Sequence, residues 1–384
     1  MSEENSVSIR IVYLWGQWTG YMAATVEAIR AAHPSEVSVM VPDPNVDAQS
    51  RIRLFDLDSL GRNVSEFVLT NGAPTNDEVA AFLDRIRPDI VVVSGWNYHG
   101  YMRAMRENAG RFVRALSMDN QWRWKPKQLA GLAAAPWMLH PCFDVVFASG
   151  ARQRRFAHGL GFDQSRIYEG YLSCDWPLFS AQPAAFDRPE KFLYAGRIVD
   201  DKGIDELVRG YRLYRSRTHN PWPLEIIGTG PLEPKVRGES GITLTPFKQP
   251  AELAAAFREA SCFILPSKIE PWGVVLHEAA SAGLPLIASH AVGSGDVVLR
   301  HGWNGHLLDR VDDVSIADAL GRIAALRRPE LKVLGDRSRQ LAKDLTPAIW
   351  AETFWRCYDL TSPRPRSSTA RGDVPPRVRL VQNA

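Results

Sequence analysis

Short apolar runs alternate with helix-like segments along this chain, and that alternation limits the fold more than any other feature. In the first half, apolar runs lie at 8–14, 89–93, 111–117 and 143–148, and a helical pattern at 21–32 follows the first of them. Strands that are buried on both faces have continuous apolar runs, and strands that alternate with helices build parallel sheets. We therefore predict an α/β fold in which residues 1–172 form one Rossmann-like domain.

A second unit of the same kind is predicted to begin at residue 190. Its apolar runs lie at 191–195, 223–227, 241–244, 262–265 and 285–288. Two amphipathic helices follow the helical spacing, the first through Ile204, Leu207, Val208, Tyr211 and Tyr214 and the second through Ile316, Leu320 and Ile323. The stretch 173–189 holds three prolines and shows no periodicity, so we predict a linker there. Residues 190–346 are the predicted second domain.

The end of the chain differs from both units. An aromatic-rich helix is predicted at 347–360. From Ser362 the sequence is rich in Pro, Arg, Ser and Gly, which predicts a disordered basic tail at 362–384. The last 24 residues carry five Arg and one Asp, although the net charge of the whole chain is only +3.

Bulk features are typical of a cytosolic protein. The four cysteines are scattered without a Cys-x-x-Cys pair, which predicts reduced and buried thiols. No apolar run approaches the roughly 18 residues that span a bilayer, and the acidic start after Met1 predicts that there is no signal peptide. Twelve Trp residues suit sugar stacking, a membrane interface or plain core packing.

Two carboxylates flank the loop that follows the apolar run 262–265. Glu270 lies in the loop, and Glu278 lies in a helical pattern that starts near Trp272. Loops at the carboxyl ends of parallel strands form ligand crevices, and ionised carboxylates are strong acceptors for hydroxyl groups. The pair therefore predicts a site for a sugar and a ribose. The structural alternative is a surface acid and a charge at a helix terminus.

Two cations lie between the run 191–195 and the helix after it. Arg197 offers a rigid donor fork and Lys202 a compact point charge, so together they suit a diphosphate at a helix N-terminus. The alternative is a solvated basic turn that is paired with Asp200 and Asp201.

Other signals narrow the chemistry. Gly228 and Gly230 follow the run 223–227 and permit either a turn or a close approach to a ligand. No third glycine completes a dinucleotide fingerprint, which counts against a nicotinamide or flavin enzyme. The sequence has no Gly-x-Ser-x-Gly elbow and no His spacing typical of a metal site. No nucleic-acid recognition motif accompanies the positive charge.

Five short motifs occur in order within residues 190–310. They are Gly196-Arg197 with Lys202-Gly203, Gly228-x-Gly230-Pro231, Pro266-Ser267-x-x-Glu270-Pro271-Trp272-Gly273 with Glu278-Ala279, Gly283-x-Pro285, and Gly302-x-Asn304-Gly305. Together they resemble the family 4 retaining glycosyltransferases of the GT-B fold. The resemblance implies two Rossmann-like domains facing across a cleft, with the C-terminal helix at 347–361 crossing back to the N-terminal domain.

The resemblance also implies roles for the matched residues. Arg197 and Lys202 would hold the pyrophosphate of the donor and stabilise the departing nucleoside diphosphate. Glu270 would bind the donor sugar, and Glu278 would bind the ribose. The rest of the implied donor site is Gly16, Gly196, Gly228, Gly230, Phe247, Ser267, Trp272, Gly273 and Val274. Neither a metal nor a cofactor is implied, and a UDP-sugar donor is favoured over a GDP-sugar.

The acceptor side departs from the family pattern. Many relatives carry a His-Asp pair where this chain has Met118-Asp119, so Asp119, the following Asn120 or His99 are the candidate acceptor residues. Cations at 103–127 and 152–155 are interleaved with Trp. They suit a phosphorylated lipid acceptor at an anionic membrane face, or only a solvated surface.

We therefore expect a metal-independent, retaining, hexosyltransferase-type enzyme. It would move a sugar from a nucleotide-sugar to a glycan or lipid-linked acceptor in the synthesis of a bacterial-type surface polysaccharide or glycolipid. We expect it in the cytoplasm, peripheral on the inner face of the membrane, without a nucleic-acid partner. Two alternatives stay open. One is a nucleotide-sugar epimerase or hydrolase of the same fold, and the other is a non-catalytic sugar-nucleotide-binding protein.

Overall fold

The chain forms two compact units. The computed structural model describes residues 8–42, 61, 63–181 and 188–362. Unit 1 comprises the chain up to Tyr171 and again from Pro347, and unit 2 comprises Leu172–Thr346. Apart from Ser362, the predicted basic tail lies outside the described residues.

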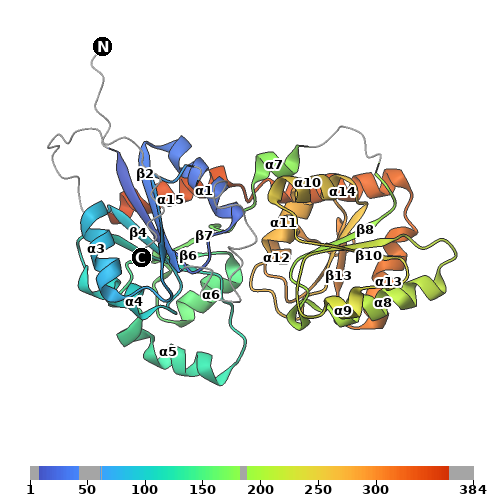
Figure 1. The fold of residues 1–384 in the computed structure, drawn as a ribbon, viewed down its shortest axis with the longest axis horizontal. Helices are drawn as coiled ribbons and strands as arrows, with labels where there is room; N and C mark the ends of the chain where they lie inside the picture. Colours follow the sequence, from blue (N-terminus) through green and yellow to red (C-terminus); the bar gives the residue numbers. More distant parts are fainter. Residues whose placement is uncertain (1–7, 43–60, 62, 182–187, 363–384) are drawn as a thin grey trace, which may run out of the picture. The chain divides into compact units, whose positions relative to one another are not determined.

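Unit 1 is a parallel sheet flanked by helices (Figure 1). Over the described residues its strand order is β3-β2-β1-β4-β5-β6-β7, and every pair is parallel. In chain order the elements are β1 (Ile9–Leu14), α1 (Gly20–Ala32), β2 (Ser35–Pro42), β3 (Glu66–Thr70), α3 (Asn76–Ile86), β4 (Ile90–Ser94), α4 (His99–Glu107), β5 (Val113–Met118), α5 (Pro126–Met138), β6 (Val145–Ala148), α6 (Ala151–Gly159), β7 (Ile167–Glu169) and α15 (Pro347–Thr361). Strands β2, β3 and β7 are not among the predicted runs.

The last helix, α15, belongs to unit 1, as expected. Its aromatic side chains pack against α1 and the sheet. The Trp350 ring lies 4.9 Å from the ring of Phe147 on β6, and the Trp355 indole donates a hydrogen bond to the Ile29 carbonyl near the end of α1 (3.0 Å). Burial of large aromatic rings contributes most of the stabilisation that such a helix can gain.

Unit 2 has the same architecture. Over its described residues the strand order is β10-β9-β8-β11-β12-β13, again with parallel pairs. Its elements are α7 (Trp176–Ser180), β8 (Phe192–Ala195), η3 (Asp200–Lys202), α8 (Ile204–Arg217), β9 (Leu224–Ile227), α9 (Glu233–Val236), β10 (Ile242–Thr245), α10 (Pro250–Arg258), β11 (Cys262–Leu265), α11 (Val274–Ser281), β12 (Leu286–Ser289), α12 (Gly295–Val298), β13 (Gly305–Leu308), α13 (Asp313–Ala324) and α14 (Arg328–Ala342). The prediction of two Rossmann-like halves is therefore confirmed.

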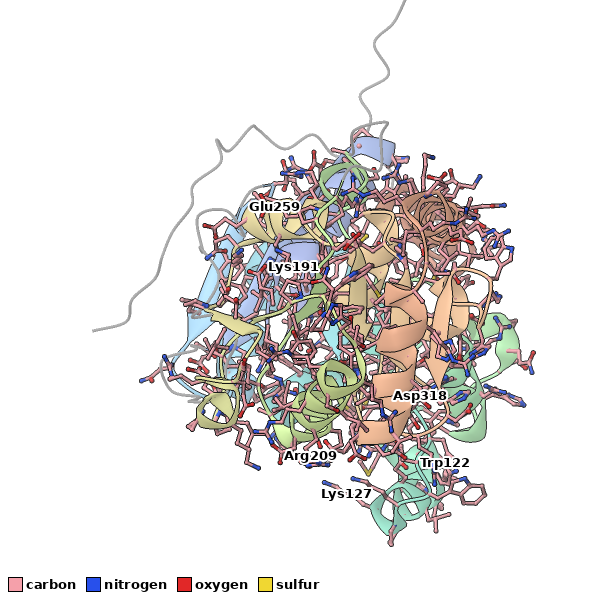
Figure 2. All side chains as sticks on the ribbon, turned by 90° about the vertical axis from the view of Figure 1, so that its right-hand side faces the viewer. Trp122, Lys127, Lys191, Arg209, Glu259 and Asp318 are labelled. Carbon is pink, nitrogen blue, oxygen red and sulfur yellow. The ribbon has the colours of Figure 1, made fainter. Side chains whose placement is uncertain are left out.

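Helices α8 and α13 show how the amphipathic patterns are satisfied. Their apolar stripes are buried in the core of unit 2, and Gly210 lets the helices approach closely, because a Cβ there would lie 2.6 Å from the Ile316 side chain. Arg209 and Asp318 lie on the exposed sides of the two helices (Figure 2).

The segment 173–189, predicted as a linker, is partly built into unit 2. Residues 176–180 form α7, and the side chains of Cys174 and Phe179 lie in the core. Arg188 is buried and donates a hydrogen bond to the Ala282 carbonyl (2.6 Å). A five-residue helix is too short to show a period, and Pro177 is compatible with a first helical turn. The proline count was therefore misleading.

All four cysteines are buried free thiols, as predicted. In the described part of the chain, no helix is both long enough and apolar enough to span a bilayer.

Both sheets reverse their strand order after the first strand. The strand order reverses between β1 and β4 in unit 1 and between β8 and β11 in unit 2. In open α/β sheets, ligands bind outside the carboxyl ends of the strands at such a switch point. Sheet topology alone therefore directs attention to the loops after β1, β4, β8 and β11.

Candidate functional site

Lys202 and Glu270 form a buried ion pair at the switch point of unit 2. Lys202 ends the turn η3 after β8, and Glu270 lies in the loop after β11. The ammonium contacts the carboxylate directly, and only 8% and 12% of the two side chains are exposed. The Ser267 hydroxyl lies 3.5 Å from the same carboxylate. The structure thus pairs Lys202, which was predicted to bind the phosphates, with Glu270, which was predicted to bind the sugar.

Main-chain contacts hold these two loops together. The Lys268 N–H donates a hydrogen bond to the Asp201 carbonyl (2.8 Å), and the Lys268 ammonium pairs with Asp200 (2.7 Å). Gly203 has a φ of 68°, and a Cβ there would lie 2.2 Å from the Pro266 carbonyl oxygen. These contacts bring the loop after β11 against η3, where Glu270 pairs with Lys202. Lys268 has a role that sequence spacing did not indicate.

The glycines after β9 pack against the loop after β8. A Cβ at Gly228 would lie 1.9 Å from the Gly196 carbonyl oxygen, and a Cβ at Gly230 would lie 2.3 Å from the Ile198 carbonyl oxygen. The two glycines therefore permit a close backbone approach, as one of the two sequence interpretations proposed. The segment that approaches them is the loop after β8. Between these contacts lies Arg197, whose side chain is exposed and whose carbonyl accepts a hydrogen bond from the Tyr194 hydroxyl (2.8 Å).

Helix α11 begins at Val274, slightly later than expected. Gly273 is its N-cap residue with a φ of 83°, and no side chain caps the helix. The Trp272 side chain is 3% exposed, and its indole donates a hydrogen bond to the Leu172 carbonyl (2.7 Å). The Trp272 ring therefore anchors the loop, and a donor could contact only the backbone there. The helix N-terminus favours an anion.

Glu278 lies one helical turn inside α11 and is partly buried. Burial, together with the nearby Asp175 carboxylate, raises the pKa of Glu278 to about 8. The carboxyl group is therefore mostly protonated at neutral pH, and it can both donate and accept a hydrogen bond. The sequence had predicted Glu278 as an ionised acceptor for the ribose hydroxyls, without a contribution from Asp175.

His277, the neighbour of Glu278, anchors α11. The Cys174 N–H donates to Nδ1 of His277 (3.1 Å), so the ring proton is on Nε2, which donates to the Ala342 carbonyl (3.0 Å). Burial lowers the pKa of His277 to about 4. The ring is therefore neutral and links three segments of unit 2.

The remaining predicted donor residues are spread over both units. Phe247 follows β10 and is partly exposed. Gly16 follows β1, and its N–H donates to the Ser94 hydroxyl at the end of β4 (2.6 Å). A Cβ at Gly16 would lie 3.3 Å from the Tyr98 ring. Gly16 and Ser94 therefore flank the switch point of unit 1, and Ser94 was not singled out from the sequence.

The candidate acceptor residues lie at the same sheet edge of unit 1. His99 is the exposed first residue of α4, and Asp119 and Asn120 are exposed directly after β5. The carbonyl of Asp119 accepts a hydrogen bond from the buried Gln153 side chain (2.9 Å). The structure thus places all three beside the carboxyl ends of β4 and β5.

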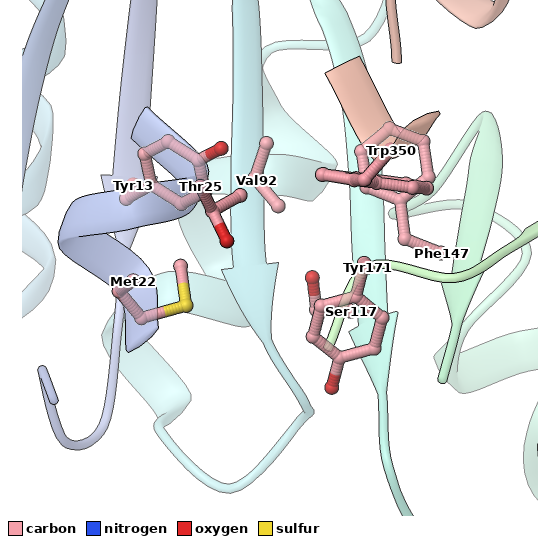
Figure 3. A pocket seen from close by; sticks show the side chains of 8 residues that line it. All are labelled: Tyr13, Met22, Thr25, Val92, Ser117, Phe147, Tyr171 and Trp350. Carbon is pink, nitrogen blue, oxygen red and sulfur yellow. The ribbon is translucent and has the colours of Figure 1, made fainter. Parts of the chain in front are cut away.

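Neither an internal cavity nor a cluster of metal-binding side chains offers a further site in the described part of the chain. A small cavity inside unit 1 has no room for a water molecule; it is lined by Tyr13, Met22, Thr25, Val92, Ser117, Phe147, Tyr171 and Trp350 (Figure 3). Among the described residues, no group of three or more His, Cys, Asp or Glu side chains is arranged to hold a metal ion.

Sequence comparison relates unit 2 to a family model, and a longer part of the chain to known proteins. Residues 177–341 match the family model described as "Glycosyl transferases group 1". The glycogen synthase of Mycobacterium tuberculosis is 29% identical over 263 residues, which cover 65% of this chain and 59% of that protein. A GDP-mannose-dependent alpha-(1-6)-phosphatidylinositol monomannoside mannosyltransferase from the same organism is 29% identical over 235 residues, covering 55% and 58%. The chain therefore spans less than two thirds of the length of these relatives.

Solved structures are similar over most of the chain. HepE from Anabaena, in complex with UDP and glucose, has a TM-score of 0.69 at 14% identity, covering 92% of this chain and 99% of that one. Sucrose-phosphate synthase from Thermosynechococcus elongatus has a TM-score of 0.68 at 18% identity, covering 92% and 100%. At such low identity the likeness shows the fold, which is that of the GT-B glycosyltransferases, as the sequence predicted.

Proposed function

We propose that this protein is a family 4 retaining glycosyltransferase that moves a sugar from a nucleotide-sugar donor to a glycan or lipid-linked acceptor. The observation that carries the proposal is the buried Lys202–Glu270 pair at the switch point of unit 2. It lies within the residues that match the group 1 model. A buried ion pair is weak support for stability, because desolvation offsets the Coulomb attraction. A role in ligand binding gives a reason for its presence.

In this proposal the donor diphosphate is bound by Arg197 and Lys202. Lys202 is paired with Glu270. Arg197 is exposed and presents a second cationic group to the diphosphate. As the diphosphate arrives, the Lys202 ammonium is shared between a phosphate oxygen and Glu270. The N-terminus of α11 adds a favourable dipole for the same anion.

The two acids would bind the donor in different ways. Glu270, which is paired with Lys202, accepts hydrogen bonds from the sugar hydroxyls. Glu278, whose pKa is raised, exchanges hydrogen bonds with the ribose hydroxyls. Phe247, in the turn after β10, is the proposed contact for the base, and a UDP-sugar is favoured over a GDP-sugar.

The proposed reaction needs no protein nucleophile. The bond between the anomeric carbon and the diphosphate oxygen breaks, and the acceptor oxygen bonds to the same face of the sugar. The proton of the acceptor hydroxyl passes to the departing nucleoside diphosphate. Arg197 and Lys202 stabilise the charge that develops on that leaving group. We propose that neither a metal nor a cofactor takes part, and that the reaction serves surface polysaccharide or glycolipid synthesis on the cytoplasmic side.

Calorimetry with UDP, GDP and ADP tests the donor site. One nucleotide should bind to the unaltered protein, and Arg197→Ala and Lys202→Ala should each lower transfer from the matching nucleotide-sugar by about a hundredfold or more. Lys332→Ala is the control, because that lysine is exposed on α14 and pairs with Asp336. NMR of the product should show the anomeric configuration of the donor.

Three outcomes would contradict the proposal. Absence of binding by all three nucleotides would remove the donor site. Near-normal transfer by both cation variants would remove the diphosphate assignment. Donor turnover at the full rate without any acceptor would favour the epimerase or hydrolase alternative.

A further inference from the structure

Helix α5 of unit 1 turns an apolar side to solvent. Residues 128–139 contain no charged side chain, and of this fully described helix only Ala135 is buried. Leu129 is 52% exposed, Trp137 72% and Met138 46%. A helix on the surface of a soluble protein normally carries polar residues on its outer face. The outer face of α5 instead carries apolar side chains.

Helical spacing places most of the exposed residues on one side. Leu129, Ala133, Pro136 and Trp137 follow the i, i+4, i+7, i+8 pattern of a single helix face, and Met138 lies off that face. The buried Ala135 lies on the opposite side. Figure 1 shows α5 at the outer edge of unit 1. The apolar residues of that face thus form one continuous surface along the helix.

The segment before α5 adds a second exposed indole. Trp124 is 78% exposed and has a φ of 55°, which is strained for a bulky side chain. The Gln128 side chain fixes this turn, because it accepts a hydrogen bond from the Arg123 N–H (2.8 Å) and donates one to the Gln121 carbonyl (2.8 Å). The indole of Trp124 is therefore held out in solvent by an ordered turn.

Positive charge lies at the same end of the helix. Arg123, Lys125 and Lys127 fall in a stretch, 120–143, that contains no acidic residue. Lys125 and Lys127 are exposed, and Figure 2 shows Lys127 together with Trp122 beside the start of α5.

Much of the wider basic face that the sequence suggested is internally paired. The pairs are Arg103 with Glu107, Arg111 with Asp84, Arg114 with Asp144, and Arg154 with Glu169. The cations at the start of α5 are therefore the best candidates for an external anion.

We propose that α5 and the turn 122–127, together the α5 surface, dock on an anionic phospholipid bilayer. Apolar residues of an interfacial helix enter the boundary between headgroups and acyl chains, and Trp rings favour that depth. Lys and Arg beside them are attracted to anionic headgroups. Charge complementarity favours this occupant over a second copy of the chain, because two copies joined through this surface would both contribute cations and residues 120–143 contain no acidic residue to pair with them. The docking does not depend on the transferase proposal, since it needs neither donor nor acceptor.

Vesicle co-sedimentation of the full chain tests the α5 surface. Binding should be strong on vesicles that contain phosphatidylglycerol and weak on phosphatidylcholine alone. Lys125→Gln/Lys127→Gln should lower the partition coefficient by about fivefold per removed cation, and added salt should have a smaller effect on this variant. Trp124→Ser/Trp137→Ser should lower it by about tenfold or more per indole.

Matched controls lie on α14 of unit 2 and directly after it. Val333→Ser removes an apolar side chain that is 45% exposed, and Lys343→Gln removes an exposed cation; both should leave vesicle binding unchanged. Thermal unfolding checks that each variant is folded, and the substituted side chains on α5 are exposed, so loss of fold is not expected.

Specific outcomes would overturn the proposal. Equal binding to both kinds of vesicle would remove the role of charge. Binding that the α5 variants do not weaken would place the contact elsewhere, for example in the Arg-rich residues 362–384. Dimerisation that Trp124→Ser/Trp137→Ser abolishes, without any vesicle binding, would assign the α5 surface to a second copy of the chain.

Discussion

Replacing Glu270 with Gln should tighten the binding of a nucleoside diphosphate while it lowers transfer. Lys202 is paired with Glu270. An incoming diphosphate must therefore share that cation with a carboxylate, and the carboxylate repels it. Gln has nearly the same shape and keeps a hydrogen-bonding oxygen, but it removes the negative charge. The full charge of Lys202 then becomes available to the diphosphate.

The expected gain can be worked from this geometry. A phosphate oxygen and the Glu270 carboxylate that both contact one ammonium lie on the order of 5–6 Å apart. Two unit charges at that separation repel by about 3 kcal/mol at an effective dielectric constant of about 20. Relaxation and solvent reduce this repulsion, so we expect a gain of about 1–2 kcal/mol, which is a roughly five- to thirtyfold lower Kd. Transfer should fall, because the neutral amide of the variant no longer offers an ionised acceptor to the sugar hydroxyls.

The same substitution should make the ligand-free protein less stable. Only 8% of the Lys202 side chain is exposed, and removing one partner of a buried ion pair costs up to about 3–5 kcal/mol. Nucleotide restores a counter-charge, so it should raise the Tm of Glu270→Gln by more than it raises the Tm of the unaltered protein.

Titration calorimetry and thermal unfolding with the nucleotide that binds best measure both effects. The matched control is Asp144→Asn in unit 1, which breaks the pair with Arg114, whose side chain is 7% exposed. That control should lower the Tm without changing the nucleotide Kd. If Glu270→Gln binds the nucleotide no more tightly than the unaltered protein, Lys202 is not the cation that meets the phosphates.

Three further substitutions and one control substitution test other contacts, each by urea unfolding. Burial holds His277 neutral with a pKa of about 4, against 6.5 in the unfolded chain. Because the unfolded state binds the extra proton, the free energy of unfolding should fall by up to about 3 kcal/mol as the pH is lowered from 6.5 to 4. His277→Gln should flatten that fall. Glu278 has a pKa of about 8, against 4.5 in the unfolded chain, so its effect on stability has the opposite direction. The folded state binds the extra proton, and the free energy of unfolding should fall as the pH rises from 4.5 to 8. If Glu278→Gln still shows this fall, Glu278 is not the group that causes it. Gly228→Ala would place a Cβ 1.9 Å from a backbone oxygen and should cost about 3 kcal/mol or more. Gly321→Ala, in open space on α13, should instead stabilise by about 0.5–1 kcal/mol.

Burial shown by a strand's own residues explains part of the outcome, although the buried β2 was missed and the partly exposed edge strand β10 was predicted. β4 is almost entirely Val and Ile, and both its faces are covered, so a continuous apolar run identifies it. β3 and β7 lie at the two edges of their sheet and carry polar residues. Hydrogen bonds to a neighbouring strand define them, and a single short segment carries no signal of its neighbour. The helix α7 was missed for a similar reason, because five residues show no period.

The candidate site was only partly predictable. Arg197, Lys202 and Glu270 were identified from their positions in strand-to-helix loops, since such loops lie at the binding edge of a parallel sheet. Their pairing was not. Lys202 and Glu270 are 68 residues apart, whereas Asp200 and Asp201 are near neighbours in sequence. The pair forms because β8 and β11 are adjacent in the sheet.

Local patterns in the chain were therefore enough to specify the fold class, the binding edge of each sheet and the kinds of side chain that lie there. Such features depend on the burial and backbone preference of neighbouring residues. Packing between distant segments settled the rest. It made Glu270 the partner of Lys202, brought Asp175 close enough to raise the pKa of Glu278, and left the apolar side of α5 uncovered. These outcomes depend on which segments become neighbours, and that is a property of the whole packed unit.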